Sequence, residues 1–222
     1  MSSAVSKNIA EVQSDMGASC AAWGRDAADV TLIAVSKKQP EDRIDAALAA
    51  GHRVYGENRV QEAQERWSTR RASYPDLNLH LIGPLQTNKA KDAVALFDCI
   101  HTLDREKLAR KLADEMSTQE RPLPCFIQVN TGDEAQKSGI STAELPEFLA
   151  FCRNDCALTI LGLMGIPPID EPPALHFALL NTLNSKHGFS HLSMGMSSDF
   201  DKALNLGATH IRVGSRIFGS RS

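Results

Sequence analysis

The chain has 222 residues, a length that α/β barrels commonly fill as one domain. It is 42% hydrophobic, 23% charged and 5% aromatic, and this balance excludes disorder, collagen-like sequence and a coiled coil. Its 24 Lys and Arg residues against 27 Asp and Glu give a formal net charge of -3, so no basic excess faces nucleic-acid phosphates. We therefore expect one globular domain over residues 1–222 that binds no nucleic acid.

The amino terminus shows no targeting signal. Residues 1–7 lack the apolar core of a signal peptide, and no apolar run reaches the length of a membrane span. The cysteines form an odd, scattered set, which is not the layout of a secreted disulfide scaffold. We expect a cytoplasmic protein with reduced thiols, no membrane association and no metal, although Cys152 and Cys156 are spaced to share one helix face.

After a leading helix near residues 3–23, short apolar runs alternate with amphipathic helical patterns such as residues 42–50 and 104–113. The runs lie at residues 30–36, 53–55, 79–82, 99–102, 125–130, 158–164, 191–194 and 210–213. Eight strands that alternate with helices are typical of a closed (β/α)8 barrel. We predict an α/β protein with a single TIM barrel.

The alternative is an open doubly wound sheet, which would carry a glycine-rich turn after its first strand. Residues 36–40 contain no glycine, so this turn does not match a dinucleotide-binding fingerprint. The sequence also lacks the P-loop, HExxH and GxSxG motifs, which excludes the commonest NTPase, zinc-protease and α/β-hydrolase interpretations.

The active face of such a barrel lies at the carboxyl ends of its strands. Lys37 follows the first strand, and a buried lysine with a lowered pKa can attack a carbonyl to form a Schiff base. Strand parity puts Lys37 on the face of Ile33 and Val35, and Lys38 on the opposite face. Parity does not say which face is inward, and a lone lysine here is more often a solvated strand cap.

The ends of the last two strands are suited to a phosphate group, which barrels often bind there. The small hydroxyls and closely approachable backbone groups belong to Ser193, Ser197, Gly214 and Ser215. An inward Arg212 needs an acceptor, and a pyridine nitrogen serves as one, which the arginine would hold unprotonated. Together with Lys37, these residues predict a site for pyridoxal 5′-phosphate (PLP).

Several ordered motifs lie across the chain, among them His-x-x-Gly-x-x-Gln-x-Asn-Lys at residues 80–89. The others occupy residues 34–37, 56–58, 137–139, 162–164, 192–197 and 212–219. From about residue 5 to its end, the sequence resembles the YggS/PROSC family of pyridoxal-phosphate homeostasis proteins. The resemblance implies the fold of the N-terminal domain of alanine racemase, a fold type III PLP protein, with an extra N-terminal helix.

The resemblance also implies roles for individual residues. Lys37 would carry PLP covalently as a Schiff base, and Arg212 would face the ring nitrogen. The other implied cofactor contacts are Asn58 and Met164 along the ring, with Ser193, Gly214 and Ser215 around the phosphate.

The resemblance implies a PLP carrier that buffers or delivers the cofactor, with PLP-dependent apo-enzymes as recipients and no dedicated turnover. Related racemases and decarboxylases add a β-rich domain and an acid/base tyrosine, whereas this sequence reaches residue 222 directly after the eighth strand. Of its two tyrosines, Tyr74 lies between a helix and a strand, and Tyr55 on the second strand suits the core as well as a functional role. The alternatives are a PLP-dependent racemase of low activity and a cofactor-free aldolase that uses Lys37. A monomer is the default expectation.

Overall fold

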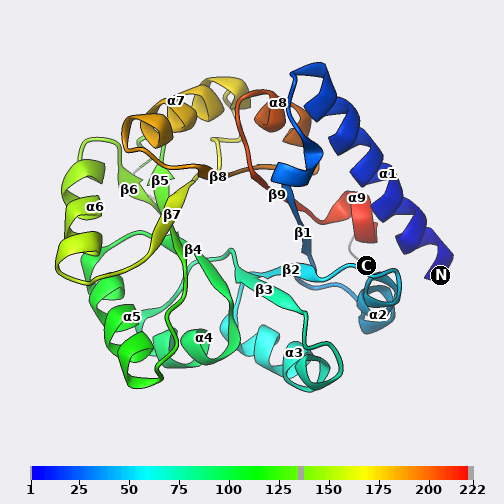
Figure 1. Cartoon of the computed structure of the whole chain (residues 1–222), viewed down its shortest axis with the longest axis horizontal. Coiled ribbons are helices and arrows are strands. Elements are labelled where there is room, and N and C mark those ends of the chain that lie inside the picture. Colours follow the sequence, from blue (N-terminus) through cyan, green and yellow to red (C-terminus); the bar gives the residue numbers. More distant parts are fainter. Residues whose placement is uncertain (1, 135–137, 220–222) are drawn as a thin grey trace.

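Eight parallel strands close into a barrel in the computed structural model, which describes residues 2–134 and 138–219 (Figure 1). The strands are β1 (Thr31–Val35), β2 (Val54–Glu57), β3 (Asn78–Leu81), β4 (Cys99–Leu103), β5 (Cys125–Asn130), β7 (Ile160–Met164), β8 (His191–Met196) and β9 (His210–Val213). Neighbours along the chain pair with one another, and β9 closes the barrel on β1 with Ile33 opposite Arg212. The predicted TIM barrel is confirmed.

Helices surround the barrel because each pair of parallel strands requires a crossover connection (Figure 1). They are α1 (Ser2–Ala22), α2 (Glu41–Ala49), α3 (Val60–Ser73), α4 (Ala90–Leu96), α5 (Glu106–Thr118), α6 (Leu145–Asn154), α7 (Pro173–Lys186), α8 (Phe200–Asn205) and α9 (Ser215–Phe218). The extra helix α1 precedes the barrel and packs against α2, α8 and α9. Its buried residues recur every three or four positions, from Val5 and Ile9 to Cys20, as one helix face requires.

The barrel strands separate an outer core from an inner one. Leu32 and Ala34 of β1 belong to the large core between the strands and the helices. Ile33 points the other way, since its Cγ2 lies 2.8 Å from where a Cβ on the β2 residue Gly56 would be. Val35 lines a cavity at the end of the barrel together with Lys37. The face shared by Ile33, Val35 and Lys37 is therefore the inward one.

One short element lies outside the predicted pattern. Strand β6 (Ile140–Ser141) pairs in parallel with the end of β5, where Ile140 is opposite Val129. It follows the segment of residues 135–137, so the motif residue Lys137 lies outside the described residues. Strand β6 extends the edge beside β5 and leaves the closed barrel unchanged.

The cysteines are all buried with free thiols, at positions 20, 99, 125, 152 and 156. Burial raises the pKa of the Cys125 and Cys152 thiols to about 12, so both behave as small apolar groups. Among the described helices, none combines the length and apolar character needed to cross a bilayer.

Candidate functional site

A cavity of about 600 Å³ opens at the carboxyl ends of β1, β2, β8 and β9. Five of the seven residues predicted to bind a cofactor line it, namely Lys37, Asn58, Arg212, Gly214 and Ser215. Ser197 and Ser198 add hydroxyls, and Ile82, Ile166 and Met196 add apolar surface. The fold thus brings most of the residues predicted from the strand ends to one cavity.

Lys37 stands on a segment fixed from both sides. It is half-buried directly after β1, whereas the exposed Lys38 has a φ of 57°, which turns the chain sharply after Lys37. Ser36 is fully buried, and its hydroxyl donates a hydrogen bond of 2.7 Å to Glu57 Oε1. The backbone on either side of Lys37 therefore has a defined course.

Glu57 joins the ends of β1 and β2 and was not singled out by the sequence. Its fully buried Oε1 also accepts from Arg66 Nη1 at 2.9 Å and from Trp67 Nε1 at 3.0 Å, both on α3. Arg66 in turn donates to the carbonyl oxygen of Ser36 at 2.9 Å. This network anchors the residue before Lys37 and the residue before Asn58. Its place in the motif at residues 56–58, inside a buried strand, was the sequence signal for it.

Arg212 on β9 is held rigidly in the barrel. Its side chain is buried, with Nη1 donating to Ser193 Oγ at 2.7 Å and Nη2 donating to the Gly165 carbonyl at 2.9 Å. Burial lowers the pKa of this guanidinium to about 10, while the charge of Asp199 opposes the shift. Arg212 is therefore still a cation at neutral pH, with its orientation fixed beside the cavity.

Small hydroxyls and backbone groups gather at the end of β8 and β9. The Gly214 N–H donates to Ser197 Oγ at 3.2 Å, and a Cβ at Gly214 would lie 3.3 Å from the Val35 carbonyl oxygen. Ser215 begins α9 beside the same cavity. The donor set here is the kind that binds a phosphate group.

Ser193 and Met164 are not brought to the cavity lining. They are register partners on β8 and β7, and both side chains are fully buried. Strand β8 runs to Met196 rather than to residue 194, so Ser193 lies inside the barrel and Ser197 occupies the strand end. Met164 packs with Cys99 and Phe126. These positions give no support to a phosphate contact by Ser193 or a ring contact by Met164.

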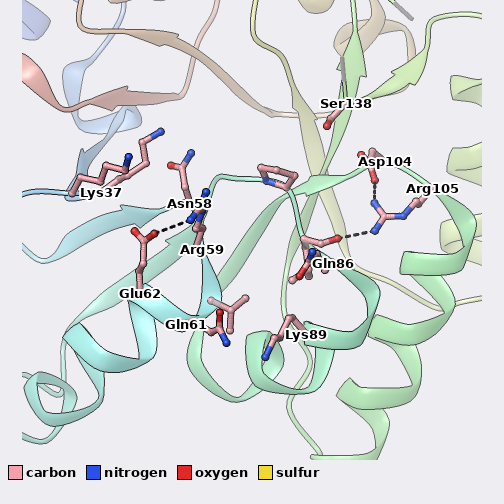
Figure 2. A pocket seen from close by; sticks show the side chains of 14 residues that line it. Lys37, Asn58, Arg59, Gln61, Glu62, Gln86, Lys89, Asp104, Arg105 and Ser138 are labelled. Carbon is pink, nitrogen blue, oxygen red and sulfur yellow. Dashed lines mark hydrogen bonds and ion pairs between the residues drawn. The ribbon is translucent and has the colours of Figure 1, made fainter. Parts of the chain in front are cut away.

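A second cavity of about 790 Å³ adjoins the first and shares Lys37 and Asn58 with it (Figure 2). Its far side carries Asp104 and Arg105, which pair at 2.5 Å. Gln86 and Lys89 of the 80–89 motif lie on its wall, whereas His80 from the same motif is buried inside the barrel. The motif at residues 80–89 therefore contributes side chains both to the wall of this cavity and to the interior of the barrel.

Both tyrosines of the chain lie away from the cavity. Tyr55 faces α3, with its ring centroid 4.6 Å from that of Trp67 and its hydroxyl donating to the His52 carbonyl at 3.3 Å. Tyr74 follows α3 and lies against Arg53. In the described part of the chain, no phenol is positioned beside Lys37.

One cluster inside the barrel has metal-ligand residue types. The donor atoms of His80, Cys99 and His101 all lie within 4.8 Å of one another. The two imidazoles are hydrogen-bonded to each other, with His80 Nδ1 and His101 Nε2 2.8 Å apart. Burial raises the pKa of the Cys99 thiol well above its usual value, and this side chain packs with Phe126 and Met164 as a small apolar group.

Comparison with known proteins gives one consistent result. Residues 3–222 match the family described as alanine racemase, N-terminal domain. A relative from Pseudomonas aeruginosa, named pyridoxal phosphate homeostasis protein, is 40% identical over 224 residues, which cover 99% of this chain and 96% of the relative. A relative of the same name from Vibrio alginolyticus is 38% identical over 229 residues, with coverage of 99% and 98%.

Solved structures agree with the sequence relatives. PipY of Synechococcus elongatus PCC7942, with PLP bound, is 35% identical with a TM-score of 0.85, covering 97% of this chain and 100% of PipY. The alanine racemase of Corynebacterium glutamicum is 16% identical with a TM-score of 0.69, covering 99% of this chain and 61% of the racemase. The likeness to the racemase shows a shared fold alone.

Proposed function

This chain belongs to the alanine racemase N-terminal domain family, and from that premise we propose that it is a PLP-binding protein of PLP homeostasis. It holds the cofactor covalently through Lys37 and buffers or delivers it. The relatives are named as homeostasis proteins rather than as enzymes, and a close structural neighbour binds PLP. Both observations support the carrier over a dedicated catalyst.

The single observation that carries the proposal is the convergence of three unlike groups on one cavity. An amine from Lys37, a guanidinium from Arg212 and the hydroxyl of Ser215 all line the same space of about 600 Å³. Small-molecule sites typically measure about 300–1,000 Å³, so a single-ring cofactor with one phosphate fits. Lys37, Arg212 and Ser215 match the aldehyde, ring nitrogen and phosphate of PLP respectively.

The role of each residue in binding PLP follows from the chemistry of its side chain. PLP, when bound, supplies an electron-withdrawing ring. Lys37 anchors the cofactor by its amine, and Arg212 donates a hydrogen bond to the ring nitrogen without giving up a proton. Gly214, Ser215 and Ser197 offer backbone and hydroxyl donors to the phosphate. Asn58 shares the wall with Lys37 and flanks the ring.

Racemisation needs a second positioned acid or base beside the reacting carbon. Tyr55 and Tyr74 are both directed away from Lys37, so neither serves as one. Interconversion of D- and L-alanine should therefore be negligible. A useful rate that disappears with Lys37→Ala would instead support the low-activity racemase.

The proposal also covers the setting in which the carrier works. Residues 1–222 act as one monomeric domain in the cytoplasm, and PLP-dependent apo-enzymes receive the cofactor. The free thiols support a reducing compartment. The closed barrel supports a monomer because it leaves few strand edges for pairing with another chain.

Titration of the purified protein with PLP, followed by visible absorption, tests the proposal. The wild type and Lys38→Ala should both develop the absorption band of lysine-bound PLP, whereas Lys37→Ala should not. Lys38 is the matched control because it is the next residue and exposed. Absence of a band in the wild type, or its persistence in Lys37→Ala, would contradict the assignment.

A further inference from the structure

A row of buried polar side chains crosses the barrel interior below the candidate cavity. Arg212 on β9 donates to Ser193 on β8 at 2.7 Å. Ser193 Oγ lies 2.9 Å from His101 Nδ1 on β4, and His101 Nε2 lies 2.8 Å from His80 Nδ1 on β3. His80 reaches a different cavity of about 400 Å³, whose lining includes Asp98, Cys99 and His210. Four strands thus contribute to one hydrogen-bonded row.

The row has a single direction because a guanidinium only donates. Ser193 Oγ accepts from Arg212, and its own hydrogen then goes to His101 Nδ1, since the fully buried Ser193 has no other side-chain hydrogen bond among the described residues. His101 consequently carries its hydrogen on Nε2 and donates to His80 Nδ1. The reverse order would leave the buried serine hydrogen without an acceptor.

In this order the row ends at His80 Nε2. With His80 Nδ1 accepting, the hydrogen of His80 lies on Nε2, and this buried atom has no partner among the described residues. Both imidazoles must be neutral for the row to hold. Burial lowers the pKa of His80 to about 4, opposed by Asp98, and lowers that of His101 well below its usual value, with His80, His210 and Arg212 adding to the effect.

The row does not conduct protons, because Arg212 at its upper end does not release one. Its effect is on orientation. Ser193 holds Nη1 and the Gly165 carbonyl holds Nη2, which fixes the plane of the guanidinium next to the cavity. His101 in turn fixes the Ser193 hydroxyl, and its ring stacks on Phe126 at 4.4 Å between centroids.

We propose that Ser193, His101 and His80 are positioning residues, which form a one-way hydrogen-bonded chain and hold Arg212 as a directed donor to the ring nitrogen of the bound cofactor. The inference rests on the proposed function for the identity of the ligand, whereas the hydrogen-bonded row itself does not depend on that function. Neither His101 nor His80 touches the candidate cavity, and they act only through Ser193 and Arg212.

The hydrogen-bonded row can be tested without any ligand. Long-range 1H–15N correlation spectra of the ligand-free protein at neutral pH should show His80 and His101 neutral, each with its hydrogen on Nε2. A hydrogen on Nδ1 of either ring, or a protonated imidazole, would contradict the proposed order of donors in the row and would leave PLP binding untouched. Failure of the inference is therefore distinguishable from failure of the proposed function.

The positioning role is tested by comparing PLP with its deaza analogue, in which carbon replaces the ring nitrogen. Ser193→Ala should weaken PLP binding about tenfold and shift the absorption maximum of the bound cofactor, yet leave the affinity for the deaza analogue unchanged. Ser193→Thr, which keeps the hydroxyl, should restore binding. Equal weakening for both ligands would show a merely structural role and overturn the proposal.

A matched pair of aromatic replacements completes the test. His101→Phe removes a member of the chain and keeps an aromatic ring against Phe126. His210→Phe removes a buried imidazole whose ring lies 5.9 Å from that of His101 but which bonds to Thr209 instead. Only His101→Phe should weaken PLP binding selectively over the deaza analogue. An equally selective loss of PLP binding in His210→Phe would contradict the positioning role of the row.

Discussion

Three imidazoles inside the barrel should make the fold sensitive to mild acid. His80, His101 and His210 are buried, and their ring centroids lie 5.0–6.2 Å apart. Burial lowers the pKa of His80 to about 4 and of His210 to about 3, and that of His101 well below 6.5. The folded state therefore keeps all three neutral at pH values where the unfolded chain takes up protons.

The sign and size of the effect follow from proton linkage. Because the folded pKa is lower than the unfolded one, each imidazole contributes its full stability above pH 6.5 and loses it as the pH falls towards the folded pKa. One pKa unit corresponds to about 1.4 kcal/mol, so at pH 5 the neutral imidazoles of His80 and His210 each cost about 2 kcal/mol relative to pH 8. Together these two cost about 4 kcal/mol, and His101 adds to the loss, which is a large part of the roughly 5–15 kcal/mol by which domains are stable.

Urea unfolding of the ligand-free protein at pH 8, 7, 6 and 5 measures this loss. The free energy of unfolding should fall by about 2.5 kcal/mol or more between pH 6 and pH 5, which corresponds to about two protons from His80 and His210 together with the contribution of His101. His210→Phe should reduce that slope by about one proton. A slope of one proton or less in the wild type would refute the reasoning, because it would mean that the buried imidazoles are protonated in the fold.

Other predictions concern backbone and network positions. Glu57→Ala leaves the cation of Arg66 without its buried partner and should cost about 3–5 kcal/mol in urea unfolding; an effect below about 1 kcal/mol would contradict the network. Gly83→Ala places a Cβ 2.3 Å from the Asn58 carbonyl oxygen, so the PLP affinity and the Tm should both fall. Unchanged values of both would show that Asn58 is not held in this position. Gly17→Ala in helix α1 adds a Cβ that meets no described atom within 4 Å beyond the adjoining backbone of its own helix, and it should instead raise stability by about 0.5–1 kcal/mol in the same unfolding assay.

The sequence was sufficient for the barrel because strands buried on both faces form continuous apolar runs. The run at residues 125–130 coincides with β5, and the run at 210–213 coincides with β9. Strand β6 has only two residues, which is too short for any periodic pattern. The sequence does not tell which face of β1 is inward, and the folded barrel shows it, because Ile33 lies against Gly56 of β2 and Val35 lines the cavity with Lys37.

Prediction of the site depended on where each strand ends. Lys37 and Gly214 lie just beyond β1 and β9, so their place at the cavity follows from a correct strand end. Strand β8 continues two residues past its apolar run, and this moved Ser193 from the expected rim into the interior. The hydrogen-bonded row through His101 depends on the register of four strands, which a local pattern does not contain.

The most direct test of the central claim is to find where PLP is attached. Borohydride reduction of the PLP-loaded protein, followed by proteolysis and peptide mass analysis, should place one pyridoxyl group on Lys37 and leave the neighbouring Lys38 unmodified. Attachment to a different lysine, or no attachment at saturating PLP, would contradict the account.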